Sequence, residues 1–207
     1  MKKISLLLAV TMLAAAITGC GAKAEAVPSA EPSAKETETV REPEVTEEAE
    51  IEDDDSLVSS YPRFKVTSEN LKNGVWEDSI SYTDQGENKS PQLSWDPVEG
   101  AQMYVIYMVD TNMQDFIHWK SDYITETNLP QGFASETEYI GPYPPEGGEH
   151  TYEIYVIALK KPVERIKGSL NGANMKFAQF IEALDTDADG NTGNIAGGAH
   201  LVGTFKN

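Results

Sequence analysis

The chain has 207 residues, of which 16 are lysine or arginine and 34 are aspartate or glutamate, so its formal net charge is −18. This charge argues against a nucleic-acid binder that works through a basic face, because the phosphate backbone would repel it. Residues 61–207 are enough for one domain with a sizeable buried core.

The first twenty residues read as a processing signal. Lys2 and Lys3 precede a short apolar run, and small residues then lead to Cys20, the only cysteine in the chain. The run is shorter than the about 20 apolar residues that span a membrane. The pattern resembles a bacterial lipoprotein signal, which implies that residues 1–19 are removed and that Cys20 carries lipid. The resemblance places the protein at the cell membrane, lipid-anchored on the extracytoplasmic face; an ordinary secretory peptide with an incidental cysteine is the alternative.

Residues 20–60 are predicted to be the lipidated cysteine and a disordered acidic tether. Glu, Ala, Pro, Ser and Thr dominate residues 21–60, and aromatic residues are absent. Such a composition buries too little apolar surface to offset the entropy of ordering the chain. The alternative is that the acidic run at 52–55 binds cations or a basic partner.

From residue 61 the composition becomes that of strands, rich in β-branched and aromatic residues and bounded by turn residues. The segment 103–109 is apolar at nearly every position, as expected of a strand buried on both faces, whereas 151–159 partly alternates and should have one wetter side. The predicted strands are 64–67, 92–95, 103–109 and 152–159.

One helix is predicted over 173–184, because Phe177, Phe180, Ile181 and Leu184 recur at helical spacing and line one face. Short strands punctuated by turns indicate a sandwich. The predicted fold class is therefore all-β: a two-sheet antiparallel β-sandwich with one or two short helices, formed by residues 61–207.

The chain has three histidines, and two of them have neighbours that suggest a site. Asp110 ends the strand at 103–109, where a carboxylate is costly unless it has a partner, and a histidine is a natural one. His118 lies in apolar sequence beside a tryptophan, and His150 follows a turn-rich stretch. If these three residues converge, they form a small polar pocket at one end of the sandwich; a packed core histidine is the alternative for His118.

Several sequence blocks carry a resemblance to a known family. They are NKSPQLSW at 88–95, the single residue Asp110, the pair at 118–119, GPYPPEGGEH at 141–150 and LVGTF at 201–205. Their order and spacing resemble the phosphatidylethanolamine-binding protein family, whose bacterial members are called Raf-kinase-inhibitor-like proteins. The resemblance implies an antiparallel β-sandwich with a small pocket for phosphate, phosphorylated head groups or other small anions.

The resemblance also implies which residues form this pocket. Asp110, His118, His150 and Tyr152 would line it, and its lip would consist of Tyr143, Pro144 and Pro145. Imidazoles donate two hydrogen bonds when protonated, and a carboxylate decides which nitrogen donates.

The chain departs from the family pattern near this pocket. After Asp110 it has Thr111, Asn112 and Met113, where the family usually has a proline, a second acid and then Ala-Pro. The segment from Asp110 to the first pocket histidine is also short, so we expect a trimmed rim. Tyr143 stands where smaller residues are common and is expected to narrow the mouth.

A second chemical signal lies outside the family blocks. Asp185, Asp187, Asp189 and Asn191 occupy alternate positions of a loop with glycine at its sixth position, like the first half of an EF-hand calcium loop. Ala196 stands where the loop's bidentate glutamate would be. The loop is therefore interpreted either as a calcium site completed by a distant carboxylate or as a solvated acidic turn.

The sequence has no Gly-x-Ser-x-Gly elbow, His-Glu-x-x-His or Walker loop, so we expect no enzyme activity. The leading interpretation is a cell-surface lipoprotein that binds a small anionic or phosphorylated ligand, with no required cofactor and calcium as an option. The alternative is a protein-interaction module, such as an inhibitor of an extracellular hydrolase. A hydrolase using the His/Asp pocket, or zinc or iron held there, is a weaker alternative. Expected partners are thus the ligand, the membrane through Cys20 and, in the alternative, a protein, but not nucleic acid.

Overall fold

The computed structural model describes residues 56–207. The expected signal peptide, the lipidated Cys20 and the tether up to residue 55 lie outside the described residues. Among the described residues, no helix has both the length and the apolar character needed to cross a membrane.

The larger sheet has six strands in the order β2-β3-β9-β8-β5-β6. Neighbouring strands are antiparallel except β3 and β9, which are parallel where Val75 pairs with Thr204. The strands are β2 (Leu71–Lys72), β3 (Val75–Trp76), β5 (Met103–Asp110), β6 (Phe116–Ile124), β8 (Glu149–Leu159) and β9 (Ile195–Lys206).

The smaller sheet covers one face of the larger one. It consists of β1 (Val66–Thr67), β4 (Leu93–Trp95) and β7 (Asn128–Leu129), in the antiparallel order β1-β4-β7. Side chains from both sheets form one apolar cluster, which includes Trp95, Ile106 and Trp119. The all-β sandwich is thereby confirmed. Short 3-10 helices lie at Asp78–Ile80 (η1) and Thr111–Met113 (η2).

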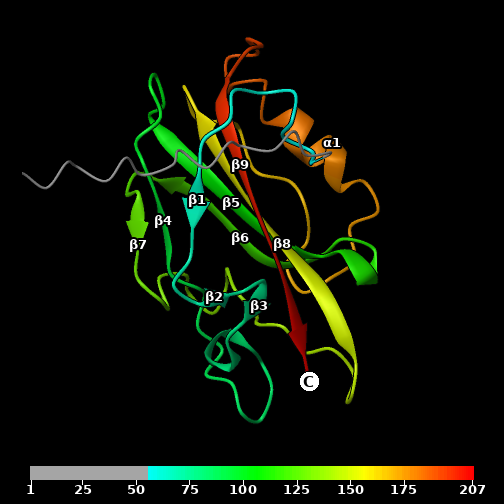
Figure 1. The fold of residues 1–207 in the computed structure, drawn as a ribbon. Helices are drawn as coiled ribbons and strands as arrows, with labels where there is room; N and C mark the ends of the chain where they lie inside the picture. The colour runs from blue at the N-terminus through cyan, green and yellow to red at the C-terminus, as the bar shows by residue number, and fades with distance from the viewer. Residues whose placement is uncertain (1–55) are drawn as a thin grey trace, which may run out of the picture. The chain divides into compact units, whose positions relative to one another are not determined.

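The other face of the larger sheet is covered by the α-helix α1 (Phe177–Ala183). In Figure 1, α1 lies on one side of β5 and β8, and β1, β4 and β7 lie on the other. Tyr155 and Ile157 belong to a second apolar cluster with Phe177 and Ile181. The prediction of a wetter side for 151–159 is therefore wrong over most of β8, because the helix and its flanking loops bury that side as well.

The four predicted strands are present, and the predicted helix is shorter at its start. The side chain of Asn174 accepts a hydrogen bond from the Ser169 amide at 2.9 Å and donates to the Gly172 carbonyl at 2.6 Å. These bonds hold the chain before residue 177 in a loop, so the helical spacing seen in the sequence begins to act only at Phe177.

The start of the folded domain differs from the sequence-based boundary. Val58 is fully buried in the second apolar cluster, so residues 56–60 belong to the folded domain and not to the tether. Its neighbour in β9 is Gly198, where an added Cβ would come within 2.6 Å of the Val58 Cβ. The glycines that hid β9 in the sequence are thus needed for close packing.

Candidate functional site

The hydrogen-bonded pair of Asp110 and His150 is the centre of the candidate site. Asp110 ends β5, and its Oδ2 lies 2.6 Å from Nδ1 of His150, near the start of β8. Its Oδ1 accepts a hydrogen bond from the Asn112 amide at 2.8 Å. A buried carboxylate needs such partners, since removal from water costs several kcal/mol. The pair also directs Nε2 of His150 away from Asp110.

His118 takes a different partner. It lies in β6, and its Nδ1 is 2.8 Å from the Ile140 carbonyl and 3.2 Å from the Gly141 carbonyl. A carbonyl only accepts, so Nδ1 carries the proton and Nε2 is an acceptor while the ring is neutral. Burial lowers the pKa of His118 from 6.5, although the Ile140 carbonyl and the Asp110 carboxylate act in the opposite direction. The ring is therefore neutral at pH 7.

Tyr152 forms the floor between the two histidines. Its ring stacks on His150 with centroids 6.5 Å apart and meets His118 edge-on at 5.2 Å. Its hydroxyl is buried near the Asp110 carboxylate and the Tyr143 amide and makes a well-formed hydrogen bond with neither. Burial, followed by the charge of Asp110, raises the pKa of Tyr152 and keeps it protonated. A buried hydroxyl in this state can donate a hydrogen bond to a bound group.

These side chains surround a cavity of about 170 Å³. The structure thus brings together six of the seven residues expected at the ligand site. Pro144 is the exception: it is buried, and its carbonyl accepts a hydrogen bond from Nδ2 of Asn207 at 2.8 Å. The lining residues are Asp110, Met113, Phe116, His118, Tyr143, Pro145, His150 and Tyr152.

Met113 and Phe116 were not identified from the sequence. Phe116 precedes His118 by two residues in β6, so the two side chains share a face of the strand, with ring centroids 5.0 Å apart. The alternation of side chains along a strand could have identified Phe116 as a neighbour of His118, but no strand was predicted at 116–124. Met113 ends η2 in the short connection after Asp110, and it is half exposed at the rim.

Tyr143 forms one wall of the cavity. Its ring lies edge-to-face with His118 at 5.7 Å and with Phe116 at 6.1 Å, and its hydroxyl donates to Oδ1 of Asn171 at 3.0 Å. These contacts place the ring of Tyr143 beside the pocket. The residue that departs from the family pattern therefore limits the size of the mouth.

Both histidines offer Nε2 to a ligand, because Nδ1 of each ring is engaged by a protein oxygen. His118 presents an acceptor at Nε2 while it is neutral. A group that carries a hydroxyl, such as a singly protonated phosphate, can donate to it. Protonation of His118 on acidification converts this acceptor into a donor and favours a fully ionised anion.

Two carboxylates of the acidic loop at 185–193 accept hydrogen bonds from nearby backbone amides. Oδ1 of Asp187 accepts from the amides of Asp189 at 2.9 Å and Asn191 at 2.8 Å, and Lys161 Nζ lies 3.3 Å from Oδ2. Asp185 accepts from two further amides of the loop and of β9. Within residues 56–207, no three histidine, cysteine, aspartate or glutamate side chains are grouped so as to hold a metal ion. Lys161 Nζ also lies 3.5 Å from Oδ2 of Asp189, so a lysine ammonium stands between two of the carboxylates that were expected to bind calcium. Asp187 closes the turn through its hydrogen bonds to the loop amides.

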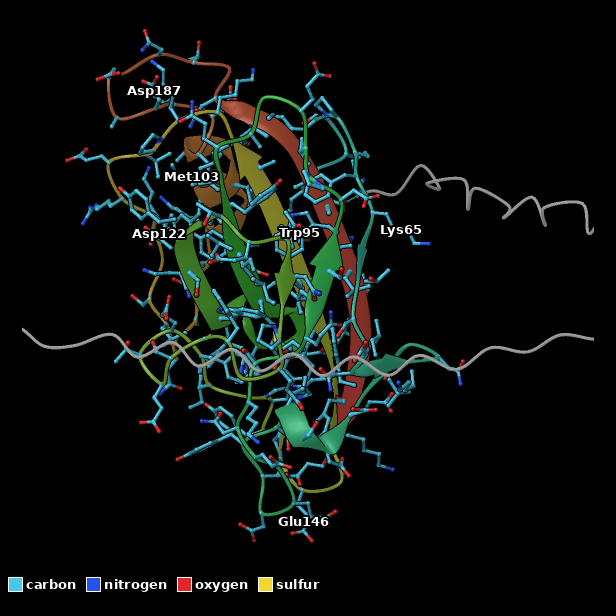
Figure 2. The ribbon with its side chains drawn as sticks, turned by 90° about the vertical axis from the view of Figure 1, so that its left-hand side faces the viewer. Lys65, Trp95, Met103, Asp122, Glu146 and Asp187 are labelled. Atoms are coloured by element: carbon cyan, nitrogen blue, oxygen red, sulfur yellow. The ribbon has the colours of Figure 1, made fainter. Side chains whose placement is uncertain are left out.

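The acidic loop is also remote from the pocket. Figure 2 shows Asp187 at one end of the domain and Glu146, from the segment that follows Pro145, at the other. The two chemical signals seen in the sequence are therefore separate features.

Comparisons with known proteins agree with this architecture. The family model described as phosphatidylethanolamine-binding protein matches residues 67–205. One similar solved structure is YbcL of Escherichia coli, described as a new member of the mammalian PEBP family. It is 22% identical to this chain with a TM-score of 0.53, and the match covers 70% of this chain and 99% of the YbcL chain. Another is CT736 of Chlamydia trachomatis D/UW-3/CX, described as a PEBP homolog. It is 26% identical with a TM-score of 0.52, and the match covers 70% of this chain and 98% of the CT736 chain. No curated protein matches the chain.

Proposed function

This chain belongs to the phosphatidylethanolamine-binding protein family, and we propose that it binds a small phosphorylated or other anionic ligand in the cavity beside Asp110, His118 and His150. The observation that carries the proposal is the Asp110–His150 pair, with 2.6 Å between Oδ2 and Nδ1, at the wall of a cavity of about 170 Å³. A buried Asp–His pair with a purely structural role would be expected to be covered by other side chains, whereas this pair borders a cavity.

The charges of the pocket support an anion as the ligand. The negative charge of Asp110 is partly offset by its hydrogen bonds with Nδ1 of His150 and the Asn112 amide. His118 then decides the net charge of the cavity: it is neutral at pH 7 and adds a positive charge only on acidification. The Tyr152 hydroxyl adds a donor that is not engaged in a well-formed bond. Anion affinity should therefore rise as the pH falls.

The cell-surface location is part of the same proposal and rests on the lipoprotein-like signal that ends at Cys20. An extracytoplasmic protein anchored in this way would meet phosphorylated ligands of the envelope or the medium. Labelling of Cys20 by a lipid precursor in cells, with Cys20→Ser as the control, tests this part separately.

Calorimetry with sulfate from pH 5 to pH 8 tests the pocket. Sulfate is chosen because its charge stays constant over this range, whereas phosphate titrates near pH 6. We expect binding by the wild type that strengthens on acidification and is weakened at least tenfold by His118→Ala and by His150→Ala, the loss expected for one charged hydrogen bond.

His200→Ala is the matched control, because His200 also pairs with a carboxylate, Oε2 of Glu153 at 3.1 Å, but lies outside this cavity. It should leave sulfate binding unchanged. Equal binding by all four proteins, or no binding by the wild type at any pH, would overturn the pocket proposal and favour the protein-interaction alternative.

A further inference from the structure

A second, larger hollow adjoins the pocket across Tyr143. It has a volume of about 460 Å³ and is lined by Tyr143 together with Tyr82, Asp84, Gln85, Glu146 and Asn207. Tyr143 lines both cavities, so its ring is the partition between them. The two cavities therefore lie side by side, and a ligand that crosses the edge of the Tyr143 ring would contact both.

One wall of the groove is a rigid loop that displays Tyr82. The amide of Tyr82 donates to the Pro142 carbonyl at 2.8 Å, and the amide of Asn88 donates to the Ser81 carbonyl at 2.9 Å. The loop closes so tightly at Gly86 that an added Cβ would lie 2.1 Å from the Ser81 carbonyl oxygen. Tyr82 nevertheless keeps 57% of its surface exposed. A large aromatic ring held in the open by a tightly bonded loop is prepared for contact with a ligand.

The opposite wall is fastened by the C-terminal residue. Asn207 accepts the Gly147 amide at 2.8 Å through its carbonyl, donates its own amide to the Gly148 carbonyl at 3.1 Å, and donates Nδ2 to the Pro144 carbonyl at 2.8 Å. These bonds hold the segment that carries Glu146. The groove thus has a defined shape before a ligand arrives, which lowers the entropy cost of binding.

The side chains of the groove define the chemistry of an occupant. Asp84 and Glu146 accept hydrogen bonds, whereas Gln85 both donates and accepts. The lining residues include no lysine, arginine or histidine, so a second anionic group would be repelled. The rings of Tyr82 and Tyr143, edge-to-face at 6.0 Å, offer an apolar surface beside these polar groups. An uncharged ring with several hydroxyls fits this combination.

We propose that the ligand is a phosphorylated sugar, with its phosphoryl group in the His/Asp pocket and its sugar ring in the groove against Tyr82. This inference rests on the proposed anion-binding function of the pocket. A short cationic group, such as a two-carbon amine, would satisfy Asp84 or Glu146, but it would leave the aromatic surface of Tyr82 and the donors of Gln85 unused. A hexose uses the aromatic surface, the acceptors and the donors together.

The test compares ligands that share a phosphate monoester. Methyl phosphate reaches the pocket only, glucose 6-phosphate adds a sugar, phosphoethanolamine adds an amine, and glucose lacks the phosphate. We expect glucose 6-phosphate to bind the wild type about tenfold more tightly than methyl phosphate, the gain that one aromatic contact with its hydrogen bonds supplies. Tyr82→Ala should remove this gain and leave methyl phosphate binding unchanged, whereas Tyr82→Phe should keep most of it.

Tyr123→Ala is the matched control, because Tyr123 is also 57% exposed but lies outside both cavities. It should keep the full gain. The sugar subsite would be wrong if methyl phosphate and glucose 6-phosphate bind equally, or if Tyr82→Ala keeps the tighter binding of glucose 6-phosphate. Either result would leave the anion-binding proposal for the pocket intact. A gain shown by phosphoethanolamine and not by glucose 6-phosphate would also overturn the sugar subsite. If no phosphate or sulfate binds the wild type, the pocket itself fails and the sugar subsite fails with it.

Discussion

Asp110 and His150 are 40 residues apart in the chain, yet Oδ2 of one lies 2.6 Å from Nδ1 of the other. The antiparallel pairing of β5 with β8 makes this contact, because it places Asp110 opposite Tyr152, two residues beyond His150. The pair therefore links the strand register directly to the tautomer of the imidazole that borders the ligand cavity. Whatever disturbs this pair should affect both the stability of the sandwich and the chemistry of the pocket.

The first prediction concerns the coupling between these two side chains. Both are largely buried, with side-chain exposures of 4% for Asp110 and 15% for His150, so removing one leaves the other without its partner. We expect Asp110→Ala and His150→Ala each to destabilise the domain by about 3 kcal/mol. The double variant should lose less than the sum, with a coupling energy of about 1–3 kcal/mol, measured by urea unfolding. Strictly additive losses would show that the pair is not coupled.

The second prediction is a pH dependence of stability from His118. Burial lowers the pKa of His118 in the folded protein below 6.5. Below pH 6.5 the His118 ring therefore binds a proton more readily in the unfolded chain than in the folded protein. The stabilisation is therefore fully present above pH 6.5 and is lost as the pH falls from there toward the folded pKa. Urea unfolding of the wild type and His118→Gln at pH 7.5 and pH 5, in chloride buffer, checks this.

The glutamine variant should lose less stability than the wild type between these two pH values, because its side chain does not titrate. A matched measurement with sulfate should reduce the loss in the wild type, since the anion favours the protonated ring. An identical pH profile for the two proteins would exclude a lowered pKa at this position.

The third prediction concerns Asp187 in the acidic loop. Hydrogen bonds from the side chain and amide of Asn191, assisted by Lys161, lower the pKa of Asp187 to about 2. A lowered carboxyl pKa stabilises the folded state above the unfolded value near 3.9, and this contribution is lost as the pH falls toward 2. Asp187→Asn should flatten the acid limb of the stability curve, measured by thermal unfolding from pH 5 to pH 2. Asp189→Asn, at an exposed position of the same loop, should not.

The fourth prediction separates a structural loop from a calcium site. The carboxylate oxygens of Asp185 and Asp187 already accept loop amides, so a cation would have to displace those bonds. We expect the melting temperature to be the same in calcium and in a chelator. A rise in calcium that disappears in Asp187→Ala would instead restore the EF-hand-like interpretation, because a ligand bound only by the folded state stabilises it.

The fifth prediction concerns the close packing at Gly203 in β9. An added Cβ there would lie 2.4 Å from Cδ1 of Leu71 and 2.6 Å from Nε1 of Trp76, so those side chains must move. We expect Gly203→Ala to cost about 2 kcal/mol of unfolding free energy, as overpacking in a core does. Gly172→Ala is the control, because its nearest new contacts would be an ordinary 3.8 Å, and it should be near neutral.

Local sequence was sufficient to predict much of this protein. The apolar run of β5 and the β-branched and aromatic composition of β8 predicted strands, because strand preference is expressed by neighbours along the chain. The resemblance to the family, carried by the blocks around Asp110, His118 and His150, implied which residues border the pocket. The sequence pattern did not predict the strands β6 and β9. The residues of β6 are a mixture of polar and aromatic types. β9 is interrupted by glycines, which leave room for the side chains of Val58 and Trp76.

Only the tertiary structure decided how these residues act. Asp110 could have paired with either nearby histidine, and the strand register selects His150, while His118 turns to the carbonyl of Ile140. The sequence did not show which groups contact the carboxylate of Asp187 in the acidic loop, and the structure places loop amides and Lys161 beside it. Tyr143 became the partition between two cavities through contacts with rings from other segments. The physical reason is the same in each case: a residue's conformational preference depends on its chain neighbours, but its hydrogen-bond partner and the space beside it depend on segments that only folding brings together.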